Sequence, residues 1–176
     1  MSGEIEFNSD SIDLLRDAAQ DEYGNEQKRT ATIDSKAGIA LPIISAYFLA
    51  LAEMNDYKSF LNVKITTILT LLIPILKLIL YTASLMIAFL AVIWMARVVY
   101  TREYATINPR DLYTNDYLKN DPRVLSIKFL DLYFEATEHN RKENNERVVL
   151  YQQSWGFTFI SVICFVVYII LKNNFV

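Results

Sequence analysis

The sequence is poor in the residues from which most enzyme and cofactor sites are built. A single cysteine among 176 residues excludes an internal disulfide framework and a cysteine-based zinc site. A single histidine excludes a histidine-rich metal site, and four glycines leave no room for a phosphate-binding P-loop or a dinucleotide fingerprint. We therefore expect no enzyme, no metal and no resident cofactor, while a ligand-binding function stays open.

Neither sign of charge dominates the chain. The 17 Lys and Arg residues oppose 20 Asp and Glu residues, for a net charge of -3, and nothing in this balance suggests a nucleic-acid-binding protein. Apolar residues make up 53% of the chain and the mean hydropathy is +0.20, which excludes a disordered protein and exceeds an average soluble domain.

The apolar residues are concentrated in three runs, Gly38–Ala52, Ile65–Val99 and Gly156–Leu171. Only Lys77 and Arg97 bring charge into these runs. Helices that are apolar on every face belong in lipid or in the core of a large soluble domain. With their flanking residues the runs approach the ~20 residues that cross a bilayer, so we favour lipid.

The middle run poses a question of topology. As a helix it would be roughly 52 Å long at about 1.5 Å per residue, well beyond a hydrocarbon core of about 30 Å. A hairpin of two spans would turn near Tyr81–Ser84, which lacks turn-forming residues. Pro74 and Lys77 instead favour a membrane-surface helix at Asn62–Ile75 followed by one span at Leu76–Val99. A four-span arrangement remains the alternative.

The predicted fold is an all-α membrane protein with about three transmembrane helices, a membrane-surface helix and long cytosolic helical extensions. The expected segments are a cytosolic N-terminal helix (1–37), a first span (38–54), an extracytoplasmic loop and surface helix (55–75), a second span (76–99), a cytosolic loop and helix (100–154) and a third span (155–172). The segments 1–37 and 100–154, together with Arg97 at the cytosolic end of the second span, hold thirteen of the 17 Lys and Arg residues. Because these residues favour the cytoplasmic side, we expect the N-terminus inside and the C-terminus outside.

Local signals refine the polar segments. The residue before Pro109 avoids the helical region, so the chain should leave the helix at Thr106–Arg110. Asp121 and Pro122 form a strong helix start. In the helix that follows, Glu143 and Arg147 lie four residues apart and are expected to form a surface ion pair, and His139 is expected on the same surface.

Basic residues at the cytosolic ends of the spans are candidate ligand-binding residues. Arg29 and Lys36 lie two helical turns apart and share a face, and Arg110 follows the turn after the second span. Such a group suits a phosphate, because Arg offers a bidentate fork. Tyr113 and Tyr117 could then stack on a base. In the alternative interpretation Lys36 only extends its amine toward lipid headgroups and Asp34 beside it is solvated.

Two further charges lie at or within the spans. Glu53, at the far end of the first span, is a candidate pore-mouth charge. Lys77 either lines a pore or extends its amine to the membrane surface. Three short spans are too few to enclose a pore, so damage to the lipid bilayer would require a homo-oligomer.

The order of motifs resembles a known family. The stretch Arg29–Ala37, with Asp-x-Lys-Ala at its end, opens the first span, and Asn108–Arg110 follows within a dozen residues of the second. In these features the chain resembles the Pycsar-type transmembrane effectors and, more loosely, the SLATT membrane effectors of bacterial antiphage systems. The resemblance implies a dormant multi-pass protein of the bacterial inner membrane. A partner nucleotide cyclase would make a cyclic nucleotide on infection, and the effector would then impair membrane integrity and cause abortive infection.

A function of a different class also fits the residues. The cytosolic helices could dock a soluble partner, which would make the chain a non-enzymatic membrane adaptor or structural subunit. A membrane enzyme is the weakest hypothesis, because no catalytic pair, triad or metal cluster is visible in the sequence.

Overall fold

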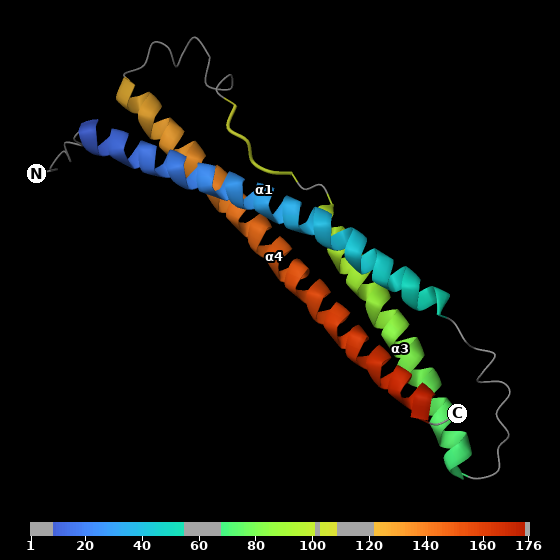
Figure 1. Ribbon diagram of the computed structural model, residues 1–176. Helices are drawn as coiled ribbons and strands as arrows, with labels where there is room; N and C mark the ends of the chain where they lie inside the picture. Colours follow the sequence, from blue (N-terminus) through green and yellow to red (C-terminus); the bar gives the residue numbers. More distant parts are fainter. Residues whose placement is uncertain (1–8, 55–67, 101–102, 109–121, 175–176) are drawn as a thin grey trace, which may run out of the picture. The chain divides into compact units, whose positions relative to one another are not determined.

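The computed structural model describes residues 9–54, 68–100, 103–108 and 122–174. These residues form three helices, α1 (Ser9–Glu53), α3 (Ile68–Val99) and α4 (Pro122–Asn174), together with a non-helical segment at 103–108 (Figure 1). Within these ranges there is no strand, and the prediction of an all-helical chain is confirmed. α3 ends at Val99 and residues 103–108 are non-helical, so the chain leaves the helix before the predicted stretch Thr106–Arg110.

The helix starts and breaks differ in part from expectation. α4 begins at Pro122, as predicted, because a proline at the first helical position has no N–H to lose. α1 is a single helix that includes Gly24 and Pro42. α3 starts at Ile68 and includes Pro74, so no helix end separates the expected surface helix from the expected span at Leu76. The rest of that surface helix, at 62–67, lies outside the described residues.

Each of the three helices contains a stretch long and apolar enough to cross a membrane. In these stretches the large apolar side chains are mostly exposed on the molecule, among them Ile43, Phe89, Phe159 and Ile163. In a soluble protein the large apolar side chains of a helix face inward. Apolar side chains that face outward are what contact with lipid requires. The described chain therefore has the helices of a membrane protein.

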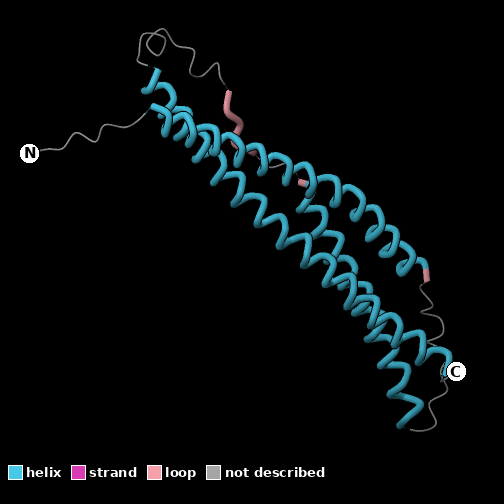
Figure 2. Tube along the Cα trace, turned by 60° about the vertical axis from the view of Figure 1, so that its left-hand side comes forward, coloured by secondary structure: helices cyan, strands magenta, loops and turns pink. Residues whose placement is uncertain are grey.

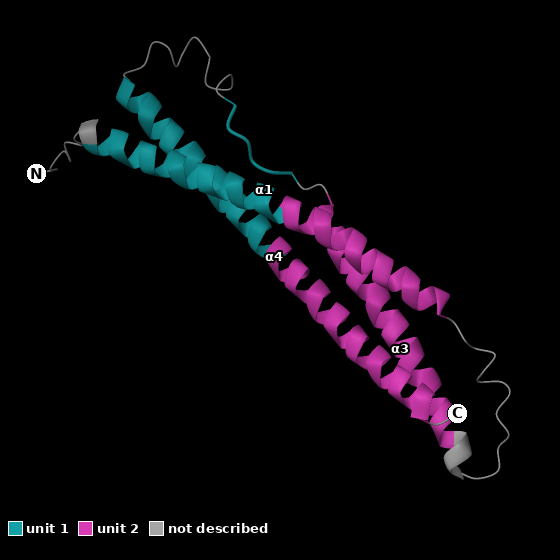
Figure 3. Ribbon diagram, viewed as in Figure 1, with its two compact units in different colours: residues 1–33, 101–146 teal, residues 34–100, 147–176 magenta. Residues whose placement is uncertain are grey.

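The chain divides into two compact units, residues 1–33 with 101–146 and residues 34–100 with 147–176 (Figure 3). α1 and α4 contribute residues to both units. In the first unit the two helices run side by side in the same direction, since Tyr23 packs on Tyr133 and Thr30 bonds Asn144 further along. The non-helical segment lies against them and bonds to both.

The second unit is a bundle of three helices. α3 runs antiparallel to α4, because Ser84 bonds Ser161 and Ala91 bonds Ser154 in reversed order. Figure 2 shows α3 beside α4 from a second direction. The buried residues of α3 and α4 in this unit recur at intervals of seven, as in a coiled coil. On α3 they form two series, Tyr81, Ala88 and Met95, and Ser84, Ala91 and Val98; on α4 they are Arg147, Ser154, Ser161 and Tyr168.

Candidate functional site

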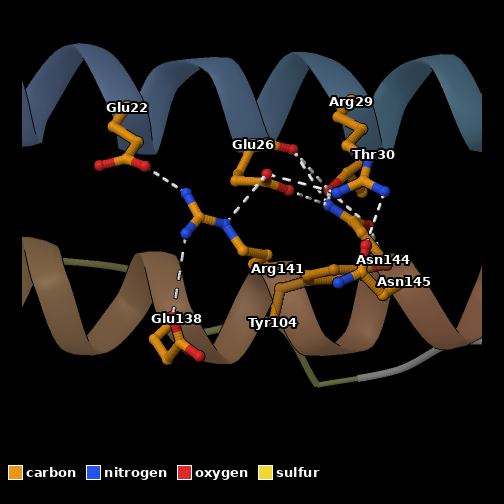
Figure 4. A network of polar contacts seen from close by, with 9 residues as sticks. All are labelled: Glu22, Glu26, Arg29, Thr30, Tyr104, Glu138, Arg141, Asn144 and Asn145. Atoms are coloured by element: carbon orange, nitrogen blue, oxygen red, sulfur yellow. Dashed lines mark hydrogen bonds and ion pairs between the residues drawn. The ribbon is translucent and has the colours of Figure 1, made fainter.

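A network of polar side chains occupies the contact between α1 and α4 in the first unit (Figure 4). At its centre is Asn144, whose side chain is fully buried. Its amide nitrogen donates to the Glu26 carboxylate at 3.0 Å and to the Thr30 hydroxyl at 3.1 Å. Its amide oxygen accepts a hydrogen bond from the Tyr104 hydroxyl at 3.2 Å. A buried amide of this kind fixes the register of two helices, because any shift leaves its polar atoms unpaired.

Two arginines complete the network. Arg141 forms ion pairs with Glu22, with Glu26 at 3.8 Å and with Glu138 at 4.0 Å. The hydrogen bond and the charge of Glu22 raise the pKa of Arg141 above its ordinary value, so this guanidinium is charged at every physiological pH. The ion pairs with Glu22 and Glu26 join α4 to α1 by charge as well as by the buried amide.

Arg29, the first of the predicted phosphate-binding residues, belongs to the same network. Its guanidinium lies 3.4 Å from the Glu26 carboxylate and donates to the side-chain oxygen of Asn145 at 2.8 Å. The side chain is partly exposed, so solvent reaches it. A phosphate at Arg29 would therefore compete with the hydrogen bond to Asn145, which joins α1 to α4.

The other predicted site residues are distributed differently. Lys36 is exposed on α1 and belongs to the second unit. Glu53 is exposed at the end of α1, and Lys77 is half-buried on α3. The predicted ligand residues at 110, 113 and 117 lie outside the described residues. The convergence of Arg29, Lys36 and Arg110 on one ligand thus stays a prediction.

The non-helical segment is held to α4 by Asn140, which is almost fully buried. The side-chain oxygen of Asn140 accepts from the Ala105 N–H at 2.9 Å, and its nitrogen donates to the Ala105 carbonyl at 3.1 Å. The Tyr23 hydroxyl donates to the same carbonyl at 3.3 Å. The Asn140 amide thereby supplies hydrogen-bond partners to the backbone N–H and carbonyl of Ala105, which lies outside any helix or strand.

A cavity of about 300 Å³ lies between this segment and α4. Its lining combines apolar and polar groups: Ala105, Thr106, Ile107 and Asn108 from the segment, and Leu132, Glu135, Ala136 and His139 from α4. Its volume is at the small end of the range for ligand pockets. His139 is exposed, as predicted, and its Nε2 lies 3.0 Å from the carbonyl oxygen of Glu103.

The most deeply buried charge of the second unit is Arg147, which the sequence placed on the surface. Only 3% of its side chain is exposed. It donates to the Asp34 carboxylate, and its Nε donates to the Val98 carbonyl at 2.9 Å. Val98 is the penultimate residue of α3, where a carbonyl has no partner within the helix, so the cation caps α3. The seven-residue spacing from Asn140 through Arg147 to Ser154 is the sequence signal that could have identified it.

The apolar part of the second unit also has a paired polar interior. The Ser161 hydroxyl donates to the Ser84 carbonyl at 2.8 Å, and the Ser84 hydroxyl donates to the Ser161 carbonyl at 3.0 Å. The Tyr47 hydroxyl lies 3.0 Å from the Ser161 hydroxyl, and Ser154 donates to the Ala91 carbonyl at 2.8 Å. Small and hydroxyl-bearing residues between helices are typical of contacts inside membranes.

Comparisons with models of known families, with curated proteins and with solved structures find no match to this chain. The described residues contain no group of three His, Cys, Asp or Glu side chains placed to hold a metal ion. The geometry defines a class nonetheless: an all-helical protein with three helices able to cross a membrane, two of which also form a polar-cored unit.

Proposed function

We propose that the chain is an effector of bacterial antiphage defence. It resides in the inner membrane with its N-terminus in the cytoplasm, and a cyclic nucleotide from a partner cyclase activates it. Active copies impair membrane integrity and cause abortive infection. The resemblance of Arg29–Ala37 and Asn108–Arg110 to the Pycsar-type effectors supports this proposal. The protein itself performs no chemical reaction.

One structural observation carries the proposal further. α1 and α4 each contribute to the polar first unit and to the apolar second unit. A ligand that binds one arrangement of the helices in the first unit more tightly than another shifts the population toward that arrangement. Because the same helices continue into the apolar stretches, such a shift reaches the membrane without any additional element.

Arg29 is the residue at which a ligand and the helix contact compete. Its hydrogen bond to Asn145 joins α1 to α4, and its ion pair with Glu26 lies within α1. A phosphate offers Arg29 a charged, bidentate partner in place of a neutral amide and a single carboxylate oxygen. Binding would therefore exchange a contact that stabilises the resting register for a contact with the ligand. Lys36 and Arg110 would supply further positive charge, and Tyr113 and Tyr117 a stacking surface.

Equilibrium dialysis of the full chain in mild detergent with four 3′,5′-cyclic mononucleotides (cAMP, cGMP, cCMP and cUMP) tests the proposal. At least one should bind. Loss of a hydrogen-bonded arginine costs on the order of 1.5–3 kcal/mol, so Arg29→Ala and Arg110→Ala should each weaken binding roughly ten- to hundredfold. The control is Lys28→Ala, an exposed cation beside Arg29. Failure of all four nucleotides to bind, or equal binding by the three variants, contradicts the proposal.

A second candidate function is supported by a separate observation. Large apolar side chains are exposed in the first unit, outside the apolar stretches, namely Leu14, Leu15, Val124, Ile127 and Phe134. Exposed apolar groups that cluster mark a docking surface. The adaptor hypothesis assigns this surface to a soluble protein. Stable co-purification with that protein, together with no toxicity on nucleotide addition, would favour the adaptor over the effector.

A further inference from the structure

The exposed apolar residues of α4 in the first unit lie on one face of the helix. Val124, Ile127 and Phe134 are separated by three and seven residues and form what we call the α4 stripe. Phe134 is the largest of them and half of its surface is exposed. No other aromatic ring of the described chain lies in a ring contact with it. Because half of this large apolar side chain is exposed to water, Phe134 is a candidate anchor for an interface.

The cavity of the first unit lies on another side of the same helix. At about 100° per residue, Phe134 points roughly 160° away from both Leu132 and Ala136, which line the cavity. Phe134 and the cavity therefore face away from one another. A protein with a projecting group on one flank and a complementary cavity on the other can bind copies of itself head to tail.

The projecting ring and the cavity also lie at the same level along α4. Phe134 is two residues from Leu132 and two from Ala136, a separation of about 3 Å along the helix axis. This match matters if all copies are held in one bilayer, as the proposed function requires, because each copy then sits at the same depth. A contact between neighbouring copies must therefore join groups at the same height along the helix. Phe134 and the cavity lie at the same height.

We infer that Phe134 of one copy inserts into the cavity of the next copy, against Ile107, Leu132 and Ala136. The inference rests on the membrane location in the proposed function and adds the interface of the homo-oligomer that the function needs. The cavity of about 300 Å³ has room for a phenyl ring, because about 150 Å³ of apolar space accommodates benzene. The contact is heterologous, so its repetition about an axis along the membrane normal gives a ring where the rotation between copies closes and an open row where it does not.

Site-directed cross-linking in native membranes tests this interface. In a Cys164→Ser background, Phe134→Cys and Leu132→Cys are made in separate chains with different tags and co-expressed. Oxidation with copper phenanthroline should give a dimer that carries both tags and little dimer from either chain alone. The two substitutions in one chain should give a ladder of dimers and larger species. Lys142 is exposed on α4 about two turns away from Phe134. In the control, Lys142→Cys takes the place of Phe134→Cys. It should not cross-link to Leu132→Cys.

Three outcomes overturn the inference. Dimers of Phe134→Cys alone show a symmetric contact in place of the heterologous one. Cross-links only to an unrelated soluble protein assign the stripe to the adaptor function. Absence of cross-links in every combination shows that the stripe and the cavity do not meet. The assay needs no nucleotide, so its result is independent of the dialysis experiment that tests the proposed function.

A second measurement guards against a folding artefact. Phe134→Asp should reduce the mass of the complex in mild detergent to that of one chain, while the helical circular dichroism signal stays unchanged, because Phe134 is half exposed in the single chain. Retention of the wild-type mass by a well-folded Phe134→Asp variant contradicts the inference.

Discussion

Arg147 donates a hydrogen bond to the carboxylate of Asp34, 113 residues earlier in the chain. The two partners are buried to very different degrees, since 3% of the Arg147 side chain and 58% of the Asp34 side chain are exposed. The same guanidinium caps the end of α3 through the Val98 carbonyl. One buried cation therefore links all three helices of the second unit, at the level where α3 ends.

The unequal burial predicts an unequal response to substitution. Asp34→Ala leaves the buried guanidinium without its carboxylate, and we expect a loss of about 1–3 kcal/mol in the free energy of unfolding. Arg147→Met also removes the cap of the Val98 carbonyl, but the carboxylate that it leaves behind is already largely solvated, so its loss should lie at the lower end of this range. Thermal unfolding in mild detergent, followed by circular dichroism, measures both.

The double variant Asp34→Ala/Arg147→Met provides the control for this pair. It should be at least as stable as Asp34→Ala alone, because it removes the buried charge together with its partner. If the losses of the two single variants simply add, Asp34 and Arg147 do not act as a pair.

The Asn140 amide predicts a local effect on hydrogen exchange. Asn140→Ala removes the acceptor of the Ala105 N–H and the donor to its carbonyl. Exchange at Ala105 should accelerate by on the order of tenfold, the equivalent of about 1.4 kcal/mol. Exchange along the first half of α1 should change much less. Mass spectrometry of peptides that cover 103–108 reports the change, and unchanged protection there would show that the segment is held by other contacts.

Much of the fold follows from sequence patterns with a direct physical cause. Long uncharged runs predict the apolar helices, and Asp121–Pro122 predicts the start of α4, because both depend on neighbouring residues alone. The continuous α3 differs from the prediction, in which Pro74 and Lys77 mark the boundary between a surface helix and the span. The sequence signals fix where helices are possible more firmly than where one helix ends and another begins.

The buried polar groups were not predicted, for a different reason. Hydropathy assigns Asn140, Asn144 and Arg147 to the surface, and a helical pair with Glu143 explained Arg147 without any tertiary contact. Their burial depends on partners more than a hundred residues earlier in α1, or on the carbonyls of Ala105 and Val98. The sequence indicates their burial only through the seven-residue spacing of polar residues on α4. A search for apolar periodicity does not detect this spacing.

The hydroxyl contacts between α3 and α4 predict a contrast between two substitutions at one position. Ser161→Ala removes hydrogen bonds that are each worth about 0.6 kcal/mol inside a membrane, so its effect on unfolding should be small. Ser161→Leu inserts bulk where no surface is exposed and should cost about 1–3 kcal/mol. Val162→Leu, on the exposed side, is the matched control and should be neutral. Equal effects at 161 and 162 would contradict the packing of α3 on α4.

The distribution of Lys and Arg predicts the topology. Alkaline phosphatase fused after Val176 should be active, and green fluorescent protein fused there should not fluoresce, because three spans place the C-terminus outside when the N-terminus is inside. The reverse pattern, with a cytoplasmic N-terminus, would contradict the three-span model.

We propose that a cyclic nucleotide makes this protein permeabilise a membrane. The most direct test is potassium release from sealed vesicles that contain the purified full chain, with each of the four 3′,5′-cyclic mononucleotides added in turn. We predict that at least one nucleotide accelerates release, that Lys28→Ala responds as the wild type does, and that Arg29→Ala loses the response. Vesicles with fully inserted, helical protein that retain their potassium with all four nucleotides would contradict the account.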